Sequence, residues 1–212
     1  KEYRRQRQMC IRDRSVIMDG RFDDDKSLIF NYGQSSTTFT NILSGASKAM
    51  FSIRIAPSVD SGITGAFGAR ELINRMQLKM TAMDITTKTT GATLLVRAYL
   101  NAVPSAATTW TNAVGNAAGA VNSSLAQIAD HGTGAVTVSG GEVVGGFYVG
   151  GTLSTDLKDL RDLGNCILGG GSTAANSGIY PDGPDTLTIV VTNLGASAVD
   201  VQGRISWTEA QA

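Results

Sequence analysis

TLTIVVTNLGASAVDVQGRISWTE, residues 186–209, carries the alternating pattern that decides the fold class of this chain. Apolar side chains alternate with polar ones in both halves of the stretch: Leu187, Ile189 and Val191, then Val199, Val201, Ile205 and Trp207. Successive side chains of a strand point to opposite faces, so each half predicts a strand with one apolar and one polar face. Gly195 lies in the link between the halves, which predicts a hairpin loop. Because a lone hairpin is barely stable in water, we expect other strands to cover its apolar faces.

The same alternation recurs in the earlier part of the chain. It predicts further strands over 27–32, 50–57, 76–85, 94–101 and the two halves of 134–149, which a Gly-Gly pair divides. In 50–57 one set of side chains is expected to point inward and the other outward: Phe51, Ile53 and Ile55 against Ser52 and Arg54.

The stretch 76–85 changes the parity of its apolar residues. Its apolar residues lie at even-numbered positions up to Met80 and at odd-numbered positions from Met83 onward. One extra residue between them would keep both sets on the same face, which predicts a β-bulge near Ala82. The turn residues Thr89–Gly91 follow, so 76–101 is predicted to form a second hairpin.

Other segments are less regular. Residues 34–47 are rich in Ser, Thr and Gly and are expected to form a loop. The long run 104–124 of small side chains around Trp110 is also expected to be a loop, either functional, interfacial or mobile. Short helical turns are expected at 70–74 and 156–168, and 124–131 fits either a strand or one or two helical turns.

These elements predict an all-β fold, an antiparallel β-sandwich or jelly roll of about eight to ten short strands with at most short helical turns. We expect residues 15–212 to form a single domain. Neither an apolar run of membrane-spanning length nor a signal-peptide pattern is visible, so the expected product is soluble, is made in the cytoplasm and has no membrane partner.

The first fourteen residues distort the charge balance of 18 basic against 18 acidic residues. They hold six basic and two acidic side chains: Lys1, Arg4, Arg5, Arg7, Arg12 and Arg14, with Glu2 and Asp13. The remainder therefore has 12 basic and 16 acidic residues, which gives no reason to expect nucleic-acid binding. QMCIRD at 8–13 resembles the translation of a transposon end used in sequencing-library preparation. We expect 1–14 to be a non-native, disordered segment, and the alternative is a natural basic arm.

Residues suited to catalysis are few. His131 is the one histidine and no nucleophile motif surrounds it, so it is expected to be a strand-end or loop residue with local hydrogen bonds. Cys166 is expected to be a small buried residue. Acidic residues at 23–25 and the Asp182/Asp185 pair could hold calcium, although turns select the same residue types. We therefore expect no enzyme activity, no metal and no cofactor.

Two aromatic residues in predicted loops are the candidate interaction residues. Trp110 and Tyr180 could stack on sugar rings, and ordinary packing or subunit contact would explain them equally well.

Several segments taken together resemble a virion structural protein family of T-even-like myoviruses that infect marine cyanobacteria. They are RELINRMQLKM (70–80), NSSLAQIADH (122–131), DLRDLGN (159–165), GIYPDGPDTLTIVVTNLG (178–195) and GRISWTEAQA (203–212). The resemblance covers most of 21–212 and departs from the family before Ser15, which leaves open whether an anchoring segment precedes it.

The resemblance implies a non-enzymatic component of the head, tail or a fibre of the virion. Its expected partners are other copies of itself, as a homo-oligomer, and other virion structural proteins. The alternative is a carbohydrate-binding or adhesin module of the same sandwich architecture that contacts a host surface glycan through Trp110 and Tyr180.

Overall fold

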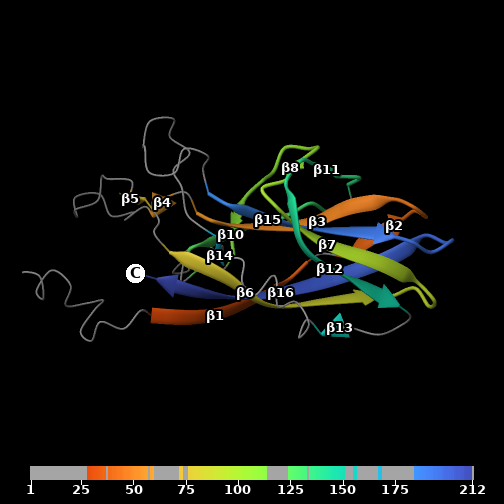
Figure 1. Ribbon diagram of the computed structural model, residues 1–212, viewed down its shortest axis with the longest axis horizontal. Helices are drawn as coiled ribbons and strands as arrows, with labels where there is room; N and C mark the ends of the chain where they lie inside the picture. The colour runs from red at the N-terminus through yellow and green to blue at the C-terminus, as the bar shows by residue number, and fades with distance from the viewer. Residues whose placement is uncertain are drawn as a thin grey trace, which may run out of the picture.

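The computed structural model describes residues 28–36, 38–56, 58–59, 72–73, 76–113, 124–132, 134–150, 155–156, 167–168 and 184–211. Within these ranges all regular secondary structure is β-strand. The strands form two main sheets, which pack as a β-sandwich, and two two-stranded ribbons (Figure 1). The predicted all-β sandwich is therefore confirmed.

The first main sheet, sheet A, has two long central strands and divided outer rows. Its six strands are β1 (Leu28–Ser35), β2 (Phe39–Ile42), β6 (Gln77–Thr87), β13 (Thr155–Asp156), β14 (Ile167–Leu168) and β16 (Val199–Gln211). β16 pairs with β6 in antiparallel orientation. β1 and β2 both pair with β16, and β13 and β14 both pair with β6. Each outer row of sheet A thus consists of two separate strands.

The second main sheet, sheet B, is a continuous antiparallel series. In spatial order its six strands are β12 (Glu142–Gly150), β7 (Thr93–Leu100), β15 (Thr186–Asn193), β3 (Ser47–Ile55), β10 (Ala126–Asp130) and β9 (Thr111–Asn112). β12 and β9 are therefore its edges among the residues that the structure describes. In Figure 1, β1, β6 and β16 lie below β3, β10 and β15.

Both predicted hairpins are wrong, although the strands themselves are right. β15 lies in sheet B and β16 lies in sheet A, so the link that contains Gly195 crosses from one sheet to the other. The link between β6 and β7 crosses between the sheets in the same way, and Gly91 in it has a φ of 75°. In such a crossing link, or arch, the apolar faces of the two strands oppose each other across the core. Alternation is the same in an arch and in a hairpin, so the pattern could not distinguish them.

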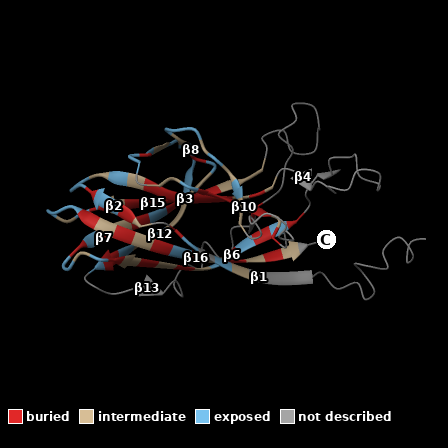
Figure 2. Ribbon diagram, turned by 180° about the vertical axis from the view of Figure 1, so that it is seen from behind, coloured by how far each residue is buried: buried red, intermediate tan, exposed pale blue. Residues whose placement is uncertain are grey.

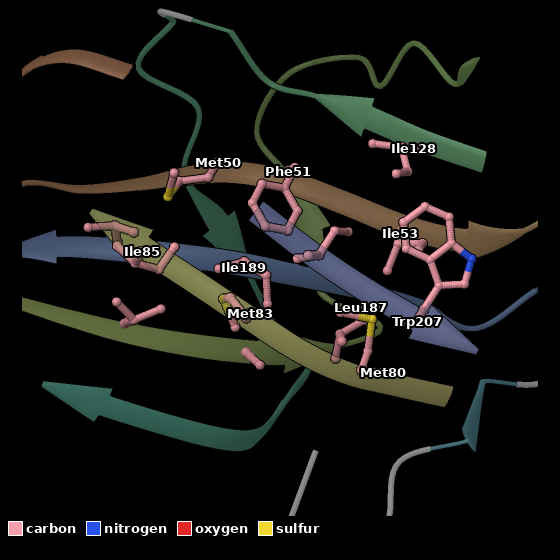
Figure 3. Packing of buried hydrophobic residues seen from close by; sticks show 14 of the residues in the cluster. Met50, Phe51, Ile53, Met80, Met83, Ile85, Ile128, Leu187, Ile189 and Trp207 are labelled. Carbon is pink, nitrogen blue, oxygen red and sulfur yellow. The ribbon is translucent and has the colours of Figure 1, made fainter. Parts of the chain in front are cut away.

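The core fills the space between the sheets with large apolar side chains from both (Figure 3). All residues predicted to be inward in the two halves of 186–209 are buried: Leu187, Ile189, Val191, Val199, Val201, Ile205 and Trp207. The ring of Tyr32 lies 5.8 Å from that of Trp207, centroid to centroid. Burying one large aliphatic or aromatic side chain contributes about 1.5–3 kcal/mol, so this cluster is the main source of stability. Figure 2 shows the buried residues on the strands of both sheets.

The bulge predicted near Ala82 is confirmed. Ser206 pairs with Ala82 and Trp207 pairs with Met80, which leaves Thr81 as the extra residue. The extra residue restores the inward direction of the later apolar positions, so Met83 is buried like Met80.

The remaining predictions are corrected in detail. The two main sheets contain twelve strands, six in each, because divided rows add short strands that carry no alternating signal of their own. The predicted loop 34–47 contains the end of β1, all of β2 and the start of β3, and the ambiguous 124–131 contains strand β10. Leu72–Ile73, in the expected helical turn at 70–74, forms β5 and pairs with β4 (Ser58–Val59). The ends of 156–168 are strands, and 157–166 lies outside the described residues.

The predicted Gly-Gly break in 134–149 is a kink between consecutive strands. β11 (Val138–Ser139) pairs with β8 (Val103–Pro104), while β12 pairs with β7. Gly140 and Gly141 join β11 to β12 with φ values of 63° and 74°. A Cβ on Gly141 would lie 2.7 Å from the backbone of Ala102, so this position requires glycine for space as well as for conformation.

Candidate functional site

A row of polar side chains crosses the outer face of sheet B. The register aligns Asn112 with Gln127, Gln127 with Arg54, and Arg54 with Thr186. Side chains of directly opposed residues in antiparallel strands lie on the same face of the sheet. All four residues are half-buried, so the row is a polar strip over β9, β10, β3 and β15 that still reaches solvent.

Arg54 is the centre of this row. Its position in β3 follows from alternation, because Ile53 and Ile55 on either side point into the core. Its Nε and Nη2 both donate to Oε1 of Gln127, at 3.0 and 2.8 Å. Its guanidinium carbon lies 4.2 Å from the ring centroid of Trp110, a cation–π geometry. Burial lowers the pKa of Arg54 from its ordinary value, although the group stays charged at neutral pH.

Trp110 is the last residue of a loop, and its ring packs against Arg54 on the outer face of sheet B. It immediately precedes β9, which pairs with β10, and Oγ1 of Thr111 donates to the carbonyl of Ile128 at 3.1 Å. The indole is half-buried, and the cation of Arg54 lies over its ring. Tyr180, the other predicted interaction residue, lies outside the described residues. The structure thus joins Trp110 to Arg54 and Gln127, neither of which was predicted as a site residue.

His131 belongs to a second polar cluster, on the same outer face of sheet B. Its Nε2 lies 2.8 Å from Oγ of Ser52, and that hydroxyl lies 2.7 Å from Oγ1 of Thr188. Ser52 points away from the core as predicted, but it is fully buried and not exposed to water. The segment after β10 covers it, because the backbone N–H of His131 donates to Met50 and that of Ala49 donates to Val136.

This Ser52–His131 pair resembles part of a catalytic arrangement only in composition. A nucleophile has to be reached by its substrate, and the hydroxyl of Ser52 has no accessible surface. Burial lowers the pKa of His131, and the neighbouring charge of Asp130 opposes that effect. His131 lies at the end of a strand, as predicted, and its hydrogen bonds hold the segment that covers Ser52 on the sheet.

Glu209 is a buried carboxylate near the end of β16. Its Oε1 accepts hydrogen bonds from Oγ of Ser124 at 2.5 Å and from Nε1 of Trp207 at 2.8 Å. Its Oε2 accepts the backbone N–H of Leu125 at 3.0 Å. The carboxylate therefore joins sheet A to the segment that leads into β10 of sheet B. The sequence did hold an indication that Glu209 is buried, because it is two positions after Trp207 and four after Ile205 and so lies on the same inward face of the strand.

Five large apolar side chains are exposed in the described residues, and Val103 on β8 is one of them. Val143 and Tyr148 lie on the edge strand β12, and the side chain of Tyr148 is 69% exposed. Leu43 and Leu194 lie at one end of the sandwich, where Asn193 donates through Nδ2 to the carbonyl of Ile42.

The carboxylates predicted as calcium candidates do not form a site in the described residues. Asp185 accepts a hydrogen bond from Nδ2 of Asn101 at 2.9 Å, while Asp182 and the acidic run at 23–25 lie outside those residues, as does Cys166. No group of three or more His, Cys, Asp or Glu side chains in the described ranges could hold a metal ion. Among the same residues there is no helix with the length and apolar character needed to cross a membrane.

Comparison of the chain with the models of known protein families and with curated proteins finds no match.

Proposed function

We propose that this chain is a non-enzymatic structural component of a tailed-phage virion, which acts by self-association and by binding other particle proteins. The segment resemblance to virion structural proteins of marine myoviruses motivates the proposal. The structural observation that supports it best is the open edge of sheet B at β12.

β12 has the properties of a strand that pairs with another chain. One side of it pairs with β7, and no other described strand pairs with its second side. Its nine residues include one charged side chain, Glu142, and no proline. Monomeric β-proteins usually protect such edges with lysine, proline or a bulge. The bulge of β12 lies near its start, between Val143 and Gly145, so the remainder of the edge is regular.

The test is the mass of the full chain in solution, measured by light scattering after size exclusion. We expect a discrete oligomer. We expect Tyr148→Lys to raise its dissociation constant at least tenfold, because a lysine on an edge strand opposes pairing with another edge. Gln77→Lys is the matched control, since Gln77 is also exposed but lies on β6, which pairs with strands on both sides. A stable monomer that binds no other particle protein would contradict the proposal.

The second candidate function is a carbohydrate-binding or adhesin module. The half-buried indole of Trp110, held over Arg54 on an otherwise polar strip, supports it, because aromatic and amide groups together suit sugar rings. A glycan array should then show binding by the full chain that Trp110→Ala removes. A blank array would count against this function and leave the structural role unaffected.

A further inference from the structure

The guanidinium of Arg54 is a half-buried cation with no carboxylate partner among the described residues. Its contacts are the two hydrogen bonds to Gln127 and the ring of Trp110. Both hydrogen bonds use the Nε and Nη2 side of the group, so the Nη1 and Nη2 end keeps N–H donors for another acceptor. A charge that is removed from water without a counter-charge costs free energy, and an anion bound there would offset that cost.

The surroundings of Arg54 indicate what kind of anion fits. Gln127 fixes the plane of the guanidinium by binding two of its nitrogens, and the ring of Trp110 supports one face of it. A planar group held in this way presents parallel donors, which match the two oxygens of a carboxylate. Asp185, which precedes Thr186 in the chain, accepts a hydrogen bond from Nδ2 of Asn101.

The rest of the strip suits the hydroxyl groups of a sugar. The amide of Gln127, the amide of Asn112 and the hydroxyl of Thr186 lie in one row with Arg54. Each of these groups can donate or accept a hydrogen bond. The exposed part of the Trp110 indole adds an apolar surface beside the row, as sugar sites require.

We propose that the strip formed by Arg54, Gln127, Trp110, Asn112 and Thr186 binds an acidic saccharide, with its carboxylate on the open end of the Arg54 guanidinium. This inference rests on the second candidate function, that of a carbohydrate-binding module. It adds the ligand class, because a neutral saccharide would leave the cation of Arg54 without a counter-charge.

The test uses the full chain and an array of uronate-containing oligosaccharides, the same oligosaccharides after reduction of the carboxyl group, sulfated oligosaccharides and neutral ones. Affinity for the uronate form should exceed that for the reduced form by about tenfold or more, because a charge-assisted hydrogen bond contributes about 1.5–3 kcal/mol. Arg54→Lys keeps the charge but loses the paired donors, and it should lower uronate affinity by a similar factor. Arg97→Lys is the matched control, since Arg97 is exposed on β7 of the same sheet.

The outcomes separate the inference from the function on which it rests. Equal binding of uronate and reduced forms would overturn the charge-based inference and keep the carbohydrate function. Unchanged uronate affinity in Arg54→Lys, which keeps the charge, would show that general electrostatic attraction and not the paired donors of Arg54 holds the carboxylate, and would overturn the inference. Preference for sulfated over uronate forms would overturn the carboxylate assignment. Binding of no saccharide at all would overturn both. If Arg54→Lys fails to fold, the comparison of uronate with reduced oligosaccharides on the unaltered chain still tests whether the carboxylate contributes to binding.

Discussion

Replacing Glu209 with glutamine should lower the free energy of unfolding by about 2 kcal/mol. The side chain is fully buried, and its oxygens accept hydrogen bonds from Ser124, Trp207 and the backbone of Leu125. Glutamine has nearly the same shape, so the substitution leaves the packing of the core almost unchanged. What changes is that one of the two oxygens becomes an NH₂ group.

The magnitude follows from the three donors. Oε1 can be retained as the acceptor for Ser124 and Trp207, but the new NH₂ group then faces the N–H of Leu125. A buried donor without an acceptor costs about 1–3 kcal/mol, and each retained bond weakens by about 1 kcal/mol when its acceptor loses its charge. The variant no longer has to bury a charge, which offsets part of this loss. A net decrease of about 2 kcal/mol is the expected result.

Equilibrium unfolding in urea at neutral pH measures this change. With an m-value of about 2 kcal/mol/M, the midpoint should fall by about 1 M while the m-value stays constant. Lys79→Gln is the control, because Lys79 is an exposed charged residue on β6, away from the β12 edge, and its replacement should change stability by less than about 0.5 kcal/mol. If Glu209→Gln is as mild as Lys79→Gln, or stabilises the fold, the carboxylate does not hold the two sheets together.

Three other perturbations test separate parts of the structure. Because burial lowers the pKa of His131 below 6.5, the unfolded chain binds more protons as pH falls through that value, and stability should decrease there and level off below the folded-state pKa. The melting temperature of His131→Asn between about pH 7.5 and pH 5 should therefore depend less on pH than that of the unaltered chain. Gly141→Ala should destabilise by about 2–4 kcal/mol in urea unfolding, whereas Gly140→Ala, with a similar φ and open space around it, should cost about 1 kcal/mol. Ile205→Ala removes a fully inward side chain from the core, and a loss of about 2–5 kcal/mol is expected; a value near zero would place Ile205 outside the core.

The candidate site was only partly predictable. The sequence made Trp110 a candidate interaction residue because it lies in a run of small side chains, and that remains a prediction. Its neighbours in the structure could not be predicted, because Arg54 and Gln127 lie 56 and 17 positions away from it in the chain. Only strand pairing brings them together: β10 pairs with β3 on one side and with β9 on the other. Likewise, the alternation of side chains correctly placed Ser52 on the outer face of its strand. The burial of Ser52, in contrast, depends on His131 and the segment that follows β10.

The sequence by itself determined the long strands that carry an alternating pattern and the apolar side of each, but it did not reveal shorter strands such as β2 and β5. It also determined the bulge at Thr81, because a change of parity within one strand is a local property. It did not determine which strands are neighbours. An alternating pair of segments such as 186–193 and 199–209 buries its apolar faces equally well as a hairpin beneath a second sheet or as an arch with one strand in each sheet. The tertiary structure selected the arch, because β15 obtains its hydrogen bonds from β7 and β3, and β16 obtains its own from β1, β2 and β6. That choice depends on which distant backbone groups are available to pair, and side-chain alternation carries no information about it.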